Sequence, residues 1–202
     1  TLSLHDALPI WDWAHWTGTY LHGNHVILSY TVGGASVLLA VIPRVKGTVR
    51  ASDINPHLIA LYKQIQSNPE ALIKQLRHLE KDTTEDTYYK RRAEFNTSPS
   101  PALFVYLNKV GFRGMYREGP YGFNVPYGHY QKPPVCDAEN IRNVSRLLKS
   151  VEFTCESCDD VLGRCGPSDF VYVDPPYAPE TATSFTQYTA ESFNHKKFFD
   201  NL

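Results

Sequence analysis

The sequence lacks long apolar runs, and its N-terminus lacks basic residues. The longest apolar run, Val37 to Ile42, has six residues, whereas a membrane-spanning helix needs about 20. No Lys or Arg lies ahead of an apolar segment at the N-terminus, as a secretory signal requires. We therefore expect no membrane partner and a cytoplasmic location. The 202 residues, 42% of them hydrophobic, suffice for the core of one domain plus a subdomain.

Cysteine is also scarce, and its spacing argues against a metal centre. Cys155 and Cys158 have the spacing of a zinc-binding pair. However, no second close pair exists, and no His lies between Tyr130 and Phe193. Zinc is the alternative, but we expect no metal and reduced thiols at all four cysteines, which are Cys136, Cys155, Cys158 and Cys165.

The chain has no overall excess of charge, but its charge is unevenly distributed. The formal net charge is −1. Residues 88–132, here called the basic aromatic segment, contain seven Lys or Arg against two Glu, and 11 of the 26 aromatic residues. Cations interleaved with aromatic rings are typical of surfaces that bind phosphates and bases. The alternative is a solvated helix face beside an aromatic core, and composition alone leaves both open.

The two ends of the chain differ from the rest. Residues 1–10 are similar to the translation of a common sequencing-library adapter, so we expect them to be an artefact without a place in the fold. At the other end, residues 193–202 have the pattern of a helix cut in mid-course. We expect a fragment, truncated at both ends.

Regular patterns begin at Val26 and alternate between strand and helix. Strands are predicted at 26–30, 47–52, 151–155 and 170–173, and helices at 36–42, 56–66, 69–80, 137–150 and from 101 onward. A polar stretch follows residue 80, and its cations Lys90, Arg91 and Arg92 are placed on a helix. Glycines and prolines between 111 and 134 predict hairpins and loops.

These patterns predict a Rossmann-like α/β fold with partial sheet order 3-2-1-4. We expect residues 26–65 and 136–202 to form one domain and residues 66–135 a helical and hairpin subdomain. We expect a monomer.

Two glycines and an acid follow the first two predicted strands. Gly33 and Gly34 allow close approach of a ligand to the backbone, and Asp53 ends the next strand twenty residues beyond Gly33. This spacing is typical of an acid that accepts hydrogen bonds from ribose hydroxyls. The alternative for Asp53 is the N-cap of the following helix.

Asp174-Pro175-Pro176-Tyr177 follows the apolar run 170–173, which predicts a strand buried on both faces. The prolines force a rigid, extended turn. The Asp174 carboxylate and the Pro175 carbonyl are two acceptors, which suit an amino group, and Tyr177 can stack on a flat ring. The alternative is a helix-capping Asp in a proline-stiffened loop.

The order of the glycine pair, Ser52-Asp53-Ile54-Asn55, the FNVPYG segment at 123–128 and Asp174-Pro175-Pro176-Tyr177 resembles the Dam-type DNA adenine-N6 methyltransferases. Tyr106-Leu107-Asn108-Lys109 adds to the resemblance.

This resemblance implies site-specific transfer of a methyl group from S-adenosylmethionine to a flipped adenine in double-stranded DNA. It implies that Gly33, Gly34, Asp53 and Asp174 bind the cofactor and that Asp174, Pro175, Pro176 and Tyr177 are catalytic. We expect Arg113 and Arg117 to contact bases from a hairpin, and Lys90, Arg91 and Arg92 to contact phosphates. The remaining expected DNA contacts are Lys109, Asn124, Tyr127, His129 and Lys132.

The sequence also departs from that family. Thr31-Val32-Gly33-Gly34-Ala35 lacks the Phe and the last Gly of the family's glycine motif, and no lysine precedes Lys46. These departures favour one alternative, a catalytically inactive DNA-binding fragment. A second alternative is an amino-methyltransferase that acts on RNA or protein.

Overall fold

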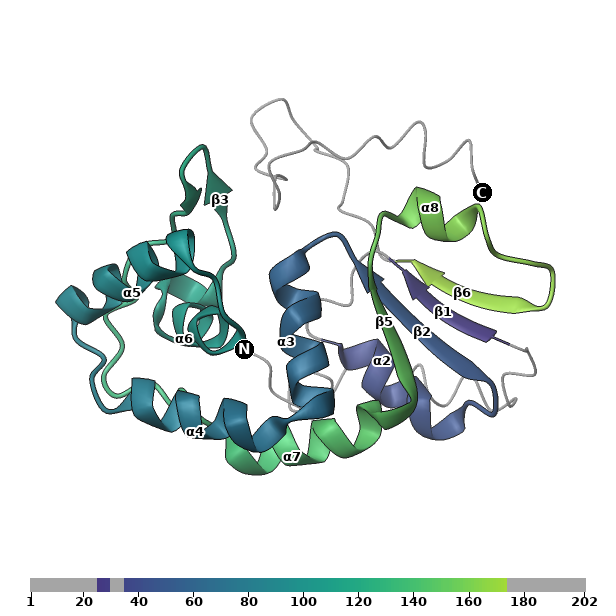
Figure 1. The fold of residues 1–202 in the computed structure, drawn as a ribbon, viewed down its shortest axis with the longest axis horizontal. Helices are drawn as coiled ribbons and strands as arrows, with labels where there is room; N and C mark the ends of the chain where they lie inside the picture. The colour runs from purple at the N-terminus through teal and green to yellow at the C-terminus, as the bar shows by residue number, and fades with distance from the viewer. Residues whose placement is uncertain (1–24, 30–34, 174–202) are drawn as a thin grey trace. The chain divides into compact units, whose positions relative to one another are not determined.

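The computed structural model describes residues 25–29 and 35–173, in which strands and helices form an α/β protein (Figure 1). These residues divide into two compact units. The first comprises residues 25–29, 35–59 and 146–173, and the second comprises residues 60–145. Helices α3 (Pro56–Ser67) and α7 (Ala138–Leu147) each cross the boundary between units.

The first unit contains a parallel sheet of four strands in the order β5-β2-β1-β6. Strands β1, β2, β5 and β6 correspond to the first, second, third and fourth strands expected from the sequence. With that numbering, the observed order is 3-2-1-4. The strands are β1 (His25–Ser29), β2 (Thr48–Asp53), β5 (Val151–Cys155) and β6 (Asp169–Val173). The short helices are α2 (Ser36–Val41), η2 (Ile42–Arg44), η4 (Leu148–Ser150) and α8 (Cys158–Leu162).

The predicted strand–helix–strand unit is confirmed. Helix α2 connects the parallel neighbours β1 and β2, and Pro43 stands in the tighter 3₁₀ turn that follows. Alternating residues of β5 are buried, among them Val151 and Phe153, whereas β2 buries Val49 and then all of its last three residues. Helix α8 was not predicted, because its five residues are too few for a helical period; Ser157 caps it by accepting a hydrogen bond from Asp160 N (3.3 Å).

The prediction that the strand before Asp174 is buried on both faces is wrong. No residue of β6 is fully buried, and Phe170 keeps 39% of its surface exposed. Within the described ranges, β6 pairs only with β1. An apolar strand at such an edge gains cover from one neighbour, so its side chains are only half-buried.

The second unit is built on helices α4 (Pro69–Glu80), α5 (Glu85–Thr97) and α6 (Pro101–Val110). Asn68, Thr84 and Ser100 cap the three helices with their side-chain oxygens. Helix α6 packs against both α4 and α5. Its buried side chains meet those of the other two helices in one core, which includes Leu72, Leu76, Tyr88, Tyr106 and Leu107. No helix in the described ranges is long and apolar enough to cross a membrane.

Helix α5 occupies most of the stretch that the sequence marks only as polar. Thr84 begins it as N-cap, and Glu85 and Asp86 lie in its first turn, where acids interact favourably with the helix dipole. Only Tyr88 and Phe95 are buried. The remaining surface is polar, so the helix shows no apolar period that could set its bounds.

A small antiparallel hairpin follows α6. It consists of β3 (Glu118–Gly119) and β4 (Gly122–Phe123), with Pro120 and Tyr121 as its turn. The prediction of hairpins and loops in this region is therefore confirmed. Arg113 lies outside the hairpin, however, in the 3₁₀ turn η3 (Phe112–Gly114), where it has a positive φ of 55°. The sequence placed Arg113 on the hairpin because Gly114 suggested its turn.

Candidate functional site

The carboxyl ends of β2 and β6 lie at the same edge of the sheet, on either side of β1. Leu28 of β1 pairs with Ala51 on one side and with Tyr172 on the other. Asp53 lies two residues beyond Ala51, and position 174 lies two residues beyond Tyr172. In open α/β sheets, ligands bind at this edge. Asp174, Pro175, Pro176, Tyr177, Gly33 and Gly34 themselves lie outside the described residues.

Asp53 is a buried carboxylate, with 6% of its surface exposed. Its Oδ1 accepts a hydrogen bond from Asn55 N (2.8 Å). Asn55 in turn caps α3, since its Oδ1 accepts from His57 N (2.9 Å) and Leu58 N (3.3 Å). The alternative of Asp53 as helix N-cap is therefore wrong, because Asn55 has that role. Asp53 instead orders the turn between β2 and α3.

The residues next to Asp53 in the sequence, Ser52 and Ile54, are buried and partly buried, respectively. Cys158 is buried and packs against Ile54, Leu162 and Val173. The hydroxyl of Ser52 is buried and has no hydrogen-bond partner in the described part of the chain. A carboxylate beside an apolar cluster suits a ligand that joins a sugar to a flat, weakly polar ring.

In the second unit, one face of α5 holds the segment 123–125. Tyr88, Arg92 and Asn96 are spaced four residues apart and so share a face of the helix. Tyr88 Oη (2.9 Å) and Arg92 Nη1 (3.1 Å) both donate to the Val125 carbonyl. Asn96 exchanges two hydrogen bonds with the backbone of Phe123, at 3.0 and 2.9 Å. Burial raises the pKa of Tyr88, so its hydroxyl stays protonated as a donor.

Arg91 contacts protein groups in this structure. Its Nη1 donates to the carbonyls of Leu79 (2.7 Å) and Asp82 (2.8 Å), at the end of α4. Its guanidinium carbon lies 4.3 Å from the centre of the Tyr106 ring. Arg92 likewise lies over the Tyr89 ring, at 4.7 Å. Both guanidinium groups thus have partners within the unit, whereas Lys90 is exposed on the same helix.

The expected base-contacting arginines have different surroundings. Arg113 is exposed, and its backbone N–H donates to Tyr130 Oη (2.9 Å). Arg117 precedes β3, and its Nε donates to Asn124 Oδ1 (2.7 Å). This contact orients the guanidinium of Arg117 along the hairpin. Arg117 and Asn124, seven residues apart, are thereby brought together.

Four further residues were expected to contact DNA, and the structure describes the surroundings of each. Tyr127 donates from its hydroxyl to the Thr83 carbonyl (2.9 Å) and packs edge-on against His129, with ring centres 4.9 Å apart. His129 and Lys132 are exposed and both have positive φ. Lys109 lies in the last turn of α6 and is half-buried. All four belong to the second unit.

Sequence reasoning did not single out Tyr88, Asn96 or Tyr121. The four-residue spacing of Tyr88, Arg92 and Asn96 could have indicated a shared face, once the polar stretch was taken as a helix. No group of three or more metal-ligating side chains occurs in the described ranges, and all four cysteines are free thiols.

Comparison with known proteins identifies the family. The model of the D12 class N6 adenine-specific DNA methyltransferases matches residues 17–199. The type II methyltransferase M.MjaIII of Methanocaldococcus jannaschii is 37% identical over 180 residues, which cover 81% of this chain and 62% of that protein. The DNA adenine methylase of Escherichia coli strain K12 is 39% identical over 150 residues, covering 70% of this chain and 54% of that protein.

A third relative, the type II methyltransferase M1.LlaDCHI of Lactococcus lactis subsp. cremoris, is 32% identical over 185 residues, covering 86% of this chain and 64% of that protein. The chain thus spans between 54 and 64% of the length of these three relatives. The match includes the sheet, Asp53 and the basic aromatic segment. The chain belongs to the D12 class N6 adenine-specific DNA methyltransferase family.

Proposed function

We propose that this protein transfers a methyl group from S-adenosylmethionine to the N6 amino group of adenine in double-stranded DNA. The observation that supports this most strongly is the register of the sheet, in which Asp53 ends β2 and Val173, the residue before Asp174 in the sequence, ends β6 at the same edge. One acid suits a sugar and the other an amine. A cofactor and an acceptor base held side by side are what methyl transfer requires.

The surroundings of Asp53 fit the nucleoside part of S-adenosylmethionine. A buried carboxylate accepts hydrogen bonds from ribose hydroxyls, and the partly buried Ile54 and Leu162, which pack on Cys158, offer an apolar surface to a flat base. Gly33 and Gly34 would allow close backbone approach. When bound, the cofactor supplies an electrophilic methyl group on a sulfonium.

Asp174 and the Pro175 carbonyl are assigned to the adenine. Two acceptors and no donor match the two hydrogens of an exocyclic amine. Hydrogen bonds to both hydrogens would localise the lone pair on N6 and orient it for in-line attack. Pro176 stiffens the turn, and Tyr177 stacks on the ring. Adenine in a duplex cannot present N6 in this way, so it must first be flipped out.

The second unit is assigned to DNA binding. Arg117 is oriented by Asn124, and Arg113 is exposed on the adjacent η3 turn. A guanidinium held in place can form the paired hydrogen bonds that distinguish guanine from other bases. Lys90, Lys109, His129 and Lys132 are assigned to the phosphate backbone.

Transfer of a labelled methyl group to three acceptors tests this function. The chain is incubated with labelled S-adenosylmethionine and, in parallel, duplex DNA, structured RNA and a protein mixture. We expect label in DNA alone. Label in RNA or protein would contradict the proposed acceptor. DNA binding without cofactor binding, both measured by calorimetry, would favour the inactive DNA-binding fragment.

A further inference from the structure

Ala35, the residue before α2, has a backbone conformation that its own side chain disfavours. Its φ of 56° and ψ of 17° lie in the left-handed region. Within the described ranges, four residues other than glycine have a positive φ, and Ala35 is the buried one, with 3% of its surface exposed. The other three, Arg113, His129 and Lys132, are exposed. The left-handed region is unfavourable for alanine because its Cβ lies too close to a carbonyl oxygen, whereas glycine has no Cβ.

The packing around Ala35 holds it in this conformation. Its carbonyl accepts a hydrogen bond from Leu39 N (2.8 Å), which begins α2. Leu38 of the same helix is buried in the first unit. Ala35 is the N-cap of α2, and its side chain makes no capping hydrogen bond. Since alanine is a poor N-cap and glycine a better one, glycine suits both the conformation and the place of this residue better than alanine does.

Residue 35 lies where its conformation can affect a bound ligand. It belongs to the connection that follows β1, the strand between β2 and β6. Asp53 ends β2 at the same carboxyl edge, where open α/β sheets bind their ligands. A change from the left-handed to the right-handed region alters φ by about 120° and so redirects the chain ahead of α2. The conformation of residue 35 therefore determines how this connection approaches a ligand at the edge.

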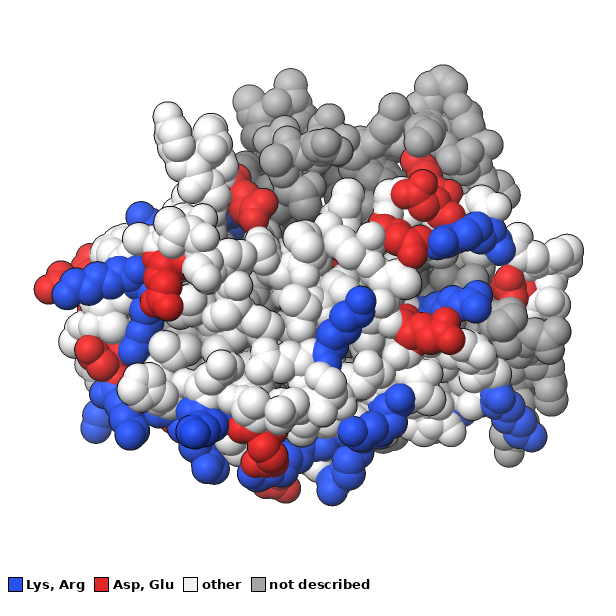
Figure 2. Space-filling model, in the orientation of Figure 1, with Lys and Arg blue, Asp and Glu red and all other residues white. Residues whose placement is uncertain are grey.

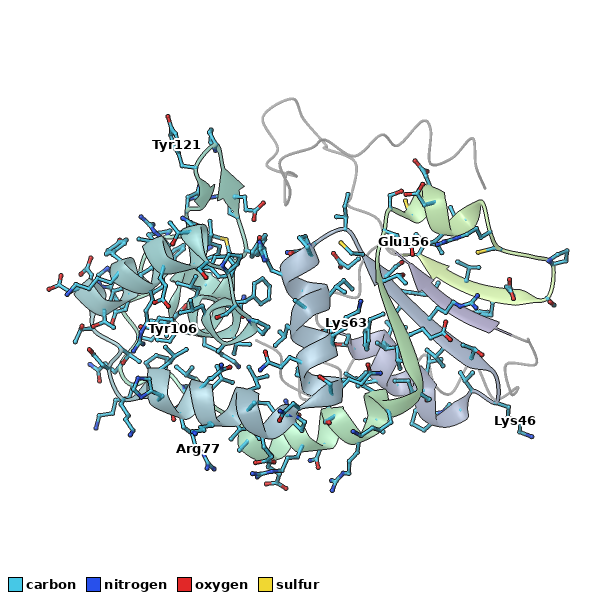
Figure 3. The ribbon with its side chains drawn as sticks, viewed as in Figure 1. Lys46, Lys63, Arg77, Tyr106, Tyr121 and Glu156 are labelled. Atoms are coloured by element: carbon cyan, nitrogen blue, oxygen red, sulfur yellow. The ribbon has the colours of Figure 1, made fainter. Side chains whose placement is uncertain are left out.

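The charged groups described at the carboxyl edge offer little to attract an anion. Figure 2 shows acidic side chains over α8, whose first turn holds two aspartates. Glu156 follows β5 at this edge, and it forms an ion pair with Arg164. Lys46 lies at the opposite edge, before β2 (Figure 3). Among the described residues, affinity at the carboxyl edge thus depends on Asp53 and on the backbone more than on a cation.

We propose that Ala35 limits the affinity of this protein for S-adenosylmethionine, as a positioning residue that acts through the backbone. This rests on the proposed function, because it takes S-adenosylmethionine as the ligand at the carboxyl edge. The Cβ of Ala35 favours other conformations of the connection when no ligand is bound, and only the left-handed fraction is competent to bind. The measured affinity is reduced by that fraction. Glycine populates both regions about equally, so Ala35→Gly removes most of this reduction.

Ala35→Gly tests the inference, with Ala40→Gly as the matched control. Ala40 lies within α2, where glycine lowers helix propensity. Calorimetry measures the dissociation constants of S-adenosylmethionine and of its demethylated product, S-adenosylhomocysteine. We expect Ala35→Gly to tighten the binding of both by at least about threefold, because the left-handed conformation becomes accessible. We expect no tightening from Ala40→Gly, and an unchanged DNA affinity for Ala35→Gly.

Thermal unfolding without cofactor separates a role in affinity from a role in stability. We expect Ala35→Gly to raise the unfolding midpoint by about 2–4 °C and Ala40→Gly to lower it. If wild type methylates DNA but Ala35→Gly binds the cofactor no more tightly, the inference is wrong while the proposed function stands, whether or not the midpoint rises. Cofactor binding by Ala35→Gly alone would support the inference. If neither protein binds S-adenosylmethionine, the proposed function fails, and the inference fails with it.

Discussion

At the scale of single residues, Asp53 and Asn55 have different roles at the junction of β2 and α3. Asn55 caps α3, and Asp53 orders the preceding turn through Oδ1. Asp53 is buried at the carboxyl edge of the parallel sheet, where open α/β sheets bind their ligands, and this position favours a ligand-binding role. Asn55 is a sufficient cap without it.

Asp53→Asn separates the role of Asp53 in the turn from its role in cofactor binding. The amide keeps an oxygen for Asn55 N but loses the charge, so we expect weaker S-adenosylmethionine binding and an intact fold. A lost charge-assisted hydrogen bond corresponds to about 1.5–3 kcal/mol. Calorimetry measures the cofactor affinity, and DNA affinity serves as control because it should barely change. Unchanged cofactor binding would leave Asp53 with only its role in the turn.

Arg91, which the sequence assigns to DNA, contacts other parts of the second unit in the structure. Its contacts with Leu79, Asp82 and Tyr106 connect α5 to α4 and α6. We expect Arg91→Ala to lower the free energy of unfolding by about 2 kcal/mol through lost hydrogen bonds and cation–π contact. Lys90→Ala is the matched control on the same helix, and should leave stability unchanged while reducing the salt dependence of DNA binding. Equal stability of both variants in urea would contradict this role for Arg91.

At the scale of elements, the capping residues made the starts of α4 and α6 predictable from the sequence. The bounds of α5 were not predicted. Asn68-Pro69 and Ser100-Pro101 both place a capping side chain before a proline at the first helical position. Thr84 caps α5 equally well, but no apolar stripe follows it. The burial of Tyr88 depends on Tyr106 and Tyr127, which lie far along the chain. Such tertiary contacts cannot be derived from local pattern.

The start of α5 should make stability depend on pH. Hydrogen bonds from the Thr87 hydroxyl and Thr84 N–H lower the pKa of Asp82 below its ordinary value of 3.8. A carboxyl whose pKa is lowered in the folded state stabilises the fold above its unfolded pKa, and that contribution is lost as pH falls through the folded value.

Asp82→Asn tests this sign. We expect the variant to unfold at a lower temperature than wild type at pH 7, with the difference shrinking below about pH 4. Thermal unfolding by circular dichroism measures it. A difference between the two proteins that is constant from pH 7 to about pH 2.5 would mean that the Asp82 charge is not involved.

The hairpin and the η3 turn should determine which DNA sequence is preferred. We expect Arg117→Ala or Arg113→Ala to reduce discrimination between target and scrambled duplexes by about 1–3 kcal/mol, if each reads a guanine. Asn124→Ala should reproduce part of the Arg117 effect, because Asn124 orients that guanidinium. Binding titrations on both duplexes measure this. Equal losses on the two duplexes would reassign the arginines to the backbone.

At the scale of the whole molecule, the sheet was predictable and the second unit only in part. The strand–helix–strand unit predicts that the first two strands are parallel neighbours, and the order 3-2-1-4 is the usual one of doubly wound sheets. The sequence expected a subdomain at 66–135, whereas the compact unit comprises residues 60–145. The wider bounds include most of α7, whose Arg142 forms an ion pair with Glu70 of α4, with Nε to Oε1 at 2.6 Å. That long-range pair has no local signal in the sequence.

Identification of the methylated nucleoside tests the central claim most directly. Duplex DNA is treated with the protein and S-adenosylmethionine, digested and analysed by mass spectrometry, with Asp174→Ala as the matched variant. We expect N6-methyl-2′-deoxyadenosine from wild type, and less than about a tenth of that rate from Asp174→Ala, a loss above about 1.4 kcal/mol of transition-state stabilisation. Methylation of another base, or an Asp174→Ala variant that retains wild-type activity, would contradict the account.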